Sequence, residues 1–141
     1  MPYIYLASPY SDPRPSARIW RMKRALAASA SLTQDGHKVF APIPIGWALE
    51  EKMGEQSHAF WLSWCMEFLQ HASYLYVLTL PGWEESLGIG AEVRRAVSLG
   101  IPIVGCDILT ECESVTGWEI KGWFLAEAPK GGELPLTDSP P

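Results

Sequence analysis

The segment from Ser86 to Glu92 combines a hydroxyl, two glycines and a carboxylate at the junction of a β-prone run and a helical pattern. Ser86 is a residue type that caps helices, and Gly88 and Gly90 let backbone amides approach a ligand closely. Free amides at a helix start, together with the helix dipole, bind anions such as phosphate. The segment is therefore either a phosphate-binding turn or an ordinary helix start.

The best-known phosphate and nucleophile motifs are absent from this segment. Val93 stands where a G-x-G-x-x-G dinucleotide fingerprint requires its last glycine. The segment also lacks the lysine of a P-loop and the serine of a G-x-S-x-G nucleophile elbow. Dinucleotide binding and serine-hydrolase chemistry are not indicated.

Glu92 lies beside the apolar face of the same predicted helix, which is formed by Ile89, Val93, Ala96 and Val97. A carboxylate near a helix N-terminus is favoured in its charged form by about 0.3–1 kcal/mol, so we expect Glu92 to be anionic at neutral pH. A partly desolvated carboxylate next to an anion site can attack, or electrostatically stabilise, a developing sugar cation.

Length and composition are those of one small domain. The chain has 141 residues, 48% of them hydrophobic, and a net charge of -5. That charge gives no general reason to bind a nucleic acid polymer or an anionic membrane. No apolar run approaches the ~20 residues of a membrane span, and Met1 to Leu6 lacks the features of a secretion signal, so a cytoplasmic protein is expected.

Metal and disulfide chemistry is not indicated either. The three cysteines, Cys65, Cys106 and Cys112, are an odd number and lack paired zinc spacing. We expect no disulfide framework, no metal and no organic cofactor.

Alternating strand and helix patterns predict a single α/β domain with a doubly wound, flavodoxin-like parallel sheet of four to five strands. Strands are expected at 2–7, 37–41, 74–80 and 101–106, and helices at 16–35, 57–72 and 87–99, with a weaker helical piece at 47–53. We divide the chain into a domain at 1–110, a C-terminal element or oligomer arm at 111–128, and a flexible tail at 129–141.

Two of these helices carry apolar stripes that are expected to be buried. The stripe of the first helix is Ile19, Met22, Leu26, Ser29 or Ala30, and Thr33. The stripe of the second is Phe60, Trp61, Trp64, Cys65, Phe68, Leu69 and Ala72.

Five cations gather near the start of the first helix: Arg14, Arg18, Arg21, Lys23 and Arg24. They either face a phosphate-bearing small ligand or form a solvated helix face, which is the usual role of a charge run.

Ligands of open parallel sheets bind beyond the carboxyl ends of the strands. Ser8, Tyr10 and Arg14 follow the first strand, where a sugar hydroxyl or phosphate would be met. Trp47 and Trp83 flank later loops, and each either stacks on a nucleobase or anchors a turn.

Several sequence blocks together resemble the nucleoside 2-deoxyribosyltransferase superfamily. The likeness covers about residues 3 to 105 and rests on the order and spacing of Ile4-Tyr5-Leu6-Ala7-Ser8-Pro9-Tyr10-Ser11, Gly36-His37-Lys38-Val39-Phe40-Ala41-Pro42, Leu80-Pro81-Gly82-Trp83, Ser86-Leu87-Gly88-Ile89-Gly90-Ala91-Glu92 and Gly100-Ile101-Pro102. The chain is similar to a small bacterial and phage branch of uncharacterised domains. Its 86–92 segment also resembles that of the 2'-deoxynucleoside 5'-phosphate N-hydrolases.

The resemblance implies a sheet of order 2-1-3-4-5, cleavage of an N-glycosidic bond, and a homo-oligomer. It implies that Glu92 attacks the anomeric carbon, that Tyr5 positions the sugar and the glutamate, and that Ser86 holds a 5'-phosphate. From the residues alone, Tyr5 is an ordinary core tyrosine.

The sequence departs from this pattern at Cys65, which takes the place of the aspartate that assists departure of the base. We count Cys65 among the substrate-binding positions, although cysteine on an apolar stripe commonly serves as a small hydrophobe. Loss of a general acid typically costs 10²–10⁴-fold in rate unless Glu67, Asp12 or a water stands in.

The expected function is therefore an N-glycosidase that acts on a nucleotide or nucleoside, preferably a (deoxy)nucleoside 5'-monophosphate. The alternatives are a weakly active or inactive nucleotide-binding module, and a base-exchanging deoxyribosyltransferase. A structural subunit that docks a partner through its Trp-rich C-terminal segment is a further interpretation.

Overall fold

One five-stranded sheet organises the chain, in the order β2-β1-β3-β4-β5. The computed structural model describes residues 2–111 and 118–125, with side chains for residues 2–106. The strands are β1 (Ile4–Ala7), β2 (Val39–Phe40), β3 (Tyr74–Leu78), β4 (Ile103–Glu111) and β5 (Trp118–Leu125). β1 to β4 are parallel, whereas β5 pairs antiparallel with β4. The predicted flavodoxin-like fold is confirmed, with an antiparallel strand at one edge.

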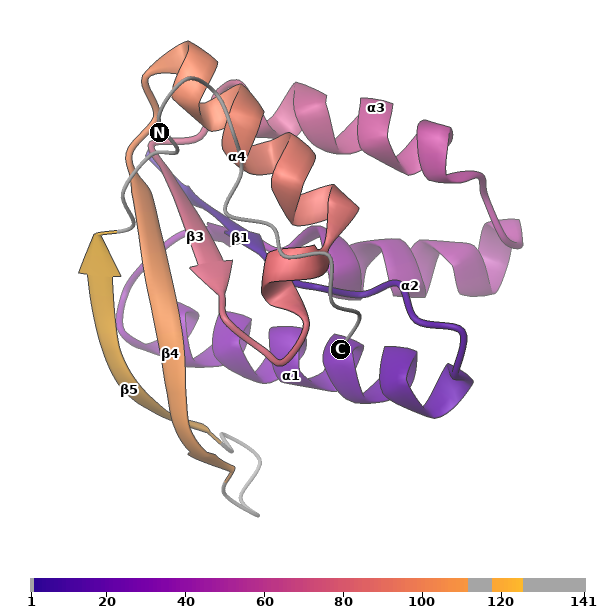
Figure 1. The fold of residues 1–141 in the computed structure, drawn as a ribbon, viewed down its shortest axis with the longest axis horizontal. Helices are drawn as coiled ribbons and strands as arrows, with labels where there is room; N and C mark the ends of the chain where they lie inside the picture. The colour runs from indigo at the N-terminus through magenta and orange to yellow at the C-terminus, as the bar shows by residue number, and fades with distance from the viewer. Residues whose placement is uncertain (1, 112–117, 126–141) are drawn as a thin grey trace.

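Helices cover both faces of this sheet (Figure 1). They are α1 (Pro15–Gln34), α2 (Pro42–Met53), α3 (His58–Leu69) and α4 (Leu87–Leu99), with a 3-10 turn, η1, at Trp83–Glu85. α1 lies on one face, and α3 and α4 lie on the other. α2 contacts α1 and β1.

Side chains of β1 alternate between the two core layers, as the period of a strand requires. Tyr5 and Ala7 pack with Ile89 and Val93 of α4, whereas Leu6 packs with residues of α1. All three β1 side chains are fully buried. β1 is thus covered on both faces, and Tyr5 is directed to the α4 side.

α4 begins and ends where the sequence predicts, at Leu87 and Leu99. The Ser86 Oγ accepts a hydrogen bond from the Ile89 amide at 3.2 Å. Gly100 ends the helix with φ 71°, a left-handed conformation that favours glycine. Both signals are local, and they fix the position of Glu92 on the helix.

α2 is longer than predicted, because it begins at Pro42 instead of near Trp47. Pro42 and Pro44 occupy the first and third positions of the helix. The first four amides of a helix have no partner within it, so prolines at these positions cost no hydrogen bond.

The stripe predicted for α1 is wrong by one residue. α1 buries Arg21, Ala25, Ala28 and Leu32, whereas Leu26 of the predicted stripe is 53% exposed. The alanines are small, and small side chains at a contact let a helix approach its neighbour closely. Ile19, Trp20 and Leu26 of α1 are exposed as a result.

The stripe predicted for α3 is only partly buried. Leu69 is buried, but Phe60 and Phe68 are exposed, and Trp61, Trp64 and Cys65 are half-buried. The aromatic rings pack mainly on one another. Phe68 stacks on Phe40 with ring centroids 4.3 Å apart, and Trp64 contacts Phe68 at 4.8 Å.

The C-terminal element predicted within 111–128 includes β5, which extends the sheet beside β4. β4 itself continues to Glu111, across the predicted domain boundary at residue 110. The predicted tail at 129–141 lies outside the described residues.

Candidate functional site

The connections of the sheet diverge between β1 and β3. The chain passes from β1 to β2 on one side and from β3 to β4 on the other. β1 and β3 are parallel neighbours, with Ala7 aligned to Val77, so their carboxyl ends lie side by side. In doubly wound sheets this is the point where ligands bind. The loops that follow β1 and β3 therefore border the candidate site.

Glu92 and Tyr5 meet on the α4 side of this point. Glu92 is 7% exposed and Tyr5 is fully buried. The Tyr5 Oη forms no hydrogen bond in this structure, yet it lies near enough to Glu92 and Cys65 for both to influence it. Burial first, and then these neighbours, hold the pKa of Tyr5 well above its ordinary value. Tyr5 is a neutral phenol at physiological pH.

Burial also raises the pKa of the Glu92 carboxyl from 4.5 to about 7, and the nearby Tyr5 hydroxyl offsets part of this rise. Burial therefore opposes the anionic form of Glu92 that the sequence predicts at neutral pH. Glu92 is the sixth residue of α4, past the first turn in which the helix dipole acts. Desolvation outweighs the dipole at that depth.

Cys65 of α3 completes a cluster with Tyr5 and Glu92. It packs against the core layer that contains Tyr5, Ile89 and Val93. Burial raises the pKa of its thiol to about 11, the Tyr5 hydroxyl lowers it in part, and Glu92 adds a smaller increase. Cys65 is therefore a neutral thiol close to Tyr5 and Glu92.

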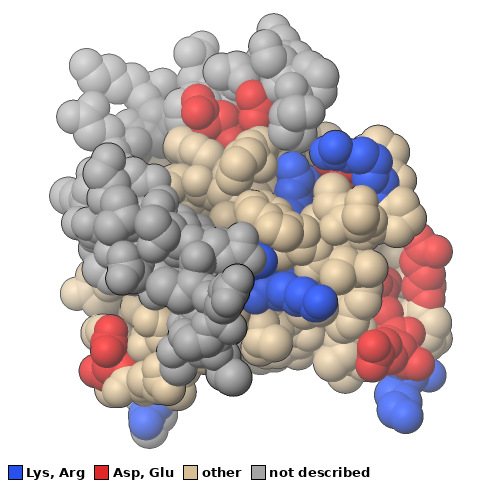
Figure 2. All heavy atoms as spheres, turned by 90° about the horizontal axis from the view of Figure 1, so that it is seen from below, with Lys and Arg blue, Asp and Glu red and all other residues tan. Residues whose placement is uncertain are grey.

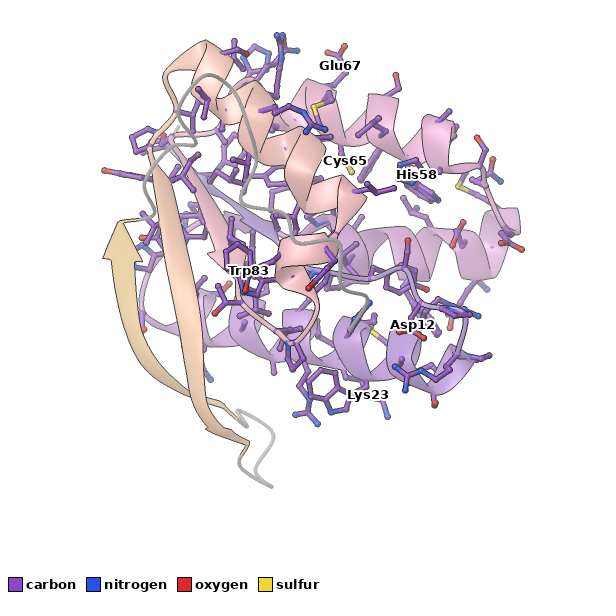
Figure 3. All side chains as sticks on the ribbon, viewed as in Figure 1. Asp12, Lys23, His58, Cys65, Glu67 and Trp83 are labelled. Atoms are coloured by element: carbon purple, nitrogen blue, oxygen red, sulfur yellow. The ribbon has the colours of Figure 1, made fainter. Side chains whose placement is uncertain are left out.

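The proposed substitutes for a general acid lie elsewhere (Figure 3). Glu67 is exposed on α3, points away from the sheet and accepts a hydrogen bond from Gln70. Asp12 precedes α1 and pairs with Arg14 at 2.9 Å, which lowers the pKa of its carboxyl. Neither contributes to the shift of the Glu92 pKa.

Ser86 and the two glycines lie at the start of α4, after the η1 turn. Ser86 is engaged as the helix cap, and its carbonyl accepts from the Gly90 amide at 3.0 Å. A Cβ on Gly88 would lie 3.8 Å from Ser86 Oγ, which is an ordinary contact. Packing among the described residues therefore does not require glycine at position 88.

The loop after β1 holds two further predicted site residues. Ser8 is 6% exposed, and its Oγ has no hydrogen-bond partner among the described residues. Tyr10 is half-buried and meets Trp47 of α2 edge-on, with ring centroids 6.5 Å apart. Trp83 packs against the core layer of Tyr5, so it anchors its turn at least in part.

Sequence reasoning missed the role of Arg21. The residue is 5% exposed, and its guanidinium donates to the carbonyls of Tyr10, Ser11 and Pro81 at 3.4, 2.8 and 3.2 Å. It thus ties the loop after β1 to the loop after β3. The sequence signal for this burial was the helical spacing between Arg21 and Ala25, which places Arg21 on the same face of α1 as the small buried residues.

The other cations near the start of α1 contact the same loop or pack nearer the surface. Arg14 pairs with the Asp12 carboxylate, and Arg18 donates to the Asp12 carbonyl. The guanidinium of Arg24 lies 5.3 Å from the centre of the Trp20 ring. Viewed from the α1 side, Lys and Arg side chains occupy the middle of the surface and acidic ones lie mostly toward its margin (Figure 2).

The structure thus defines a flavodoxin-like α/β protein. A buried carboxyl group lies near the point where the chain connections diverge between β1 and β3. The chain belongs to the family described as Domain of unknown function (DUF1937), which matches residues 2–107. That range contains every residue of the candidate site. A comparison with curated proteins found no match.

No described group of three His, Cys, Asp or Glu side chains is placed to hold a metal ion. None of the described helices is long and apolar enough to cross a membrane.

Proposed function

We propose that this chain is an N-glycosidase that cleaves the base–sugar bond of a (deoxy)nucleoside 5'-monophosphate, with Glu92 as nucleophile. The observation that carries the proposal is a carboxyl group that is 7% exposed and has no ion-pair partner among the described residues. Burying such a group is costly, and buried acids that serve only stability are paired. An unpaired, strongly perturbed carboxyl at a ligand-binding edge is typical of a catalytic group.

The proposed reaction uses Glu92, Tyr5 and the start of α4. The ionised Glu92 attacks the anomeric carbon, the bond to the base breaks, and water then hydrolyses the glycosyl ester. Tyr5 orients the carboxylate, because its hydroxyl lies beside it. Ser86 and the amides at the start of α4 hold the 5'-phosphate, assisted by the dipole of a 13-residue helix.

Hydrolysis is preferred over base exchange, because exchange requires a site that keeps the intermediate dry until a second base arrives. The test is incubation with a panel of ribo- and deoxynucleoside 5'-monophosphates, followed by chromatographic detection of free base. Adding a second free base would reveal transfer as a new nucleotide. Equal base release by the wild type and Glu92→Ala, or none from any substrate, would remove the enzymatic proposal.

Cys65 favours a second candidate, a nucleotide-binding module without turnover. A neutral thiol beside the carboxyl group is a poor proton donor, so a substrate that needs a proton would bind and not react. Thermal shift with the same nucleotide panel separates the two functions. Stabilisation without base release supports the binding module.

A further inference from the structure

Breaking an N-glycosidic bond leaves an electron pair on the nitrogen of the departing base. A neutral purine or pyrimidine then departs as an anion unless a proton reaches it. A positioned general acid supplies that proton and contributes typically 10²–10⁴-fold to the rate. Such an acid would have to lie within reach of a base held beside Glu92.

The two groups beside Glu92 both keep their protons. The pKa of the Cys65 thiol is about 11, and the pKa of Tyr5 is held well above its ordinary value. Of the carboxyl groups that could take this role, Glu67 points away from the sheet and Asp12 pairs with the Arg14 guanidinium (Figure 3). Glu92 itself cannot supply the proton, because it must be ionised to attack.

The described side chains place no positive charge beside the cluster either. Among the described side chains, no lysine or arginine shifts the pKa of Tyr5, Cys65 or Glu92. The guanidinium of Arg21 is held by the carbonyls of Tyr10, Ser11 and Pro81. A cationic group on a substrate would meet a carboxylate here and no opposing charge. Its presence would also favour the ionised form of Glu92.

We propose that the preferred substrates are nucleoside 5'-monophosphates whose base carries a positive charge, through a glycosylated pyridinium nitrogen or an alkylated purine ring. This inference rests on the proposed function. The Glu92 carboxylate forms a bond to the anomeric carbon, and the bond from that carbon to the base nitrogen breaks. The electron pair neutralises the cationic ring, so the base leaves as a neutral molecule and no acid is needed. Water then cleaves the glycosyl ester, restores the carboxylate and releases one proton to solvent.

The experiment compares substrates that differ in the charge of the base. We expect kcat/KM for nicotinamide mononucleotide and 7-methylguanosine 5'-monophosphate to exceed that for AMP and GMP by at least ~10²-fold, the effect of a missing general acid. One proton should be released for each nicotinamide. Equal or faster release of adenine or guanine overturns this inference and leaves the proposed function standing. If no nucleotide of either kind is cleaved, the proposed function itself fails.

A variant at position 65 makes the same test within one protein. Cys65→Asp places a carboxyl group beside Tyr5 and Glu92, and it should raise the cleavage of AMP by ~10²–10⁴-fold more than that of nicotinamide mononucleotide. Cys65→Ser remains neutral and should keep the preference for the cationic substrate. Glu67→Gln removes an exposed carboxylate of the same helix and should alter neither rate. Equal effects of Cys65→Asp on both substrates would contradict the inference, and if that variant does not fold, the wild-type comparison decides.

Discussion

Replacing Glu92 with glutamine should stabilise the protein at alkaline pH and have little effect in acid. The carboxyl group is 7% exposed, and burial raises its pKa from 4.5 to about 7. Below pH 4.5 the group is protonated in the folded and the unfolded chain, so it costs nothing extra. As the pH rises toward 7, the unfolded chain loses the proton first, and folding must take it up again. Above pH 7 the folded protein carries the full cost of a buried charge.

The size of this cost follows from the shift. A rise from 4.5 to about 7 is about 2.5 pH units, and each unit corresponds to about 1.4 kcal/mol, which gives roughly 3 kcal/mol above pH 8. Glutamine keeps the shape and removes the charge. Since 1 kcal/mol shifts Tm by about 2–4 °C in a chain of this size, the expected gain in Tm is roughly 6–12 °C.

Urea unfolding of the wild type and Glu92→Gln at pH 5 and pH 8.5 measures the two free energies of unfolding. The difference between the proteins should be small at pH 5 and near 3 kcal/mol at pH 8.5. Glu67→Gln, at an exposed position, should change stability by less than about 0.5 kcal/mol at both pH values. A gain for Glu92→Gln that is the same at both pH values would refute the reasoning from desolvation.

Three further predictions concern the same site. If the ionised Glu92 is the nucleophile, kcat/KM for nucleotide cleavage should rise with pH through about 7, and a flat profile from pH 5 to 9 would argue against it. Gly88→Ala should stabilise the protein by up to about 1 kcal/mol and weaken nucleotide binding, which urea unfolding and a nucleotide titration followed by thermal shift would show. Arg21→Met leaves three carbonyls without their donor and should lower the free energy of unfolding by about 3 kcal/mol, while the control Leu26→Ser at a 53% exposed position should cost less than about 0.5 kcal/mol in the same assay.

Local signals predicted the segment that contains the candidate nucleophile. Ser86 before α4 and Gly100 after it act within one turn of the chain, so their effect can be recognised from the sequence. The β-prone runs predicted the parallel strands for a similar reason, because strands covered on both faces are almost continuously apolar. The sequence alone therefore predicts the fold class.

Burial that depends on distant parts of the chain could not be predicted in this way. Arg21 is buried because carbonyls on two loops accept hydrogen bonds from its guanidinium, and one of them, that of Pro81, is 60 residues away in the sequence. The choice of Ala25 and Ala28 over Leu26 for the contact face of α1 depends on how closely the helix approaches the sheet. Hydrophobicity alone selects the larger side chain and shifts the stripe by one residue.

The rise in the pKa of Glu92 could not be predicted for the same reason, and it points to the site. A local argument sees the start of a helix, which favours the anion, whereas the folded chain places Tyr5 and the core around the carboxyl group. At the same edge of the sheet, the Ser8 hydroxyl has no hydrogen-bond partner among the residues that the structure describes, and their packing does not require the glycine at position 88 of α4. Each of these features lowers stability, and each would be removed by a single conservative substitution. These destabilising features have independent physical origins, and they lie close to the point where the chain connections diverge between β1 and β3. Such a grouping is expected where a bound ligand supplies the missing partners.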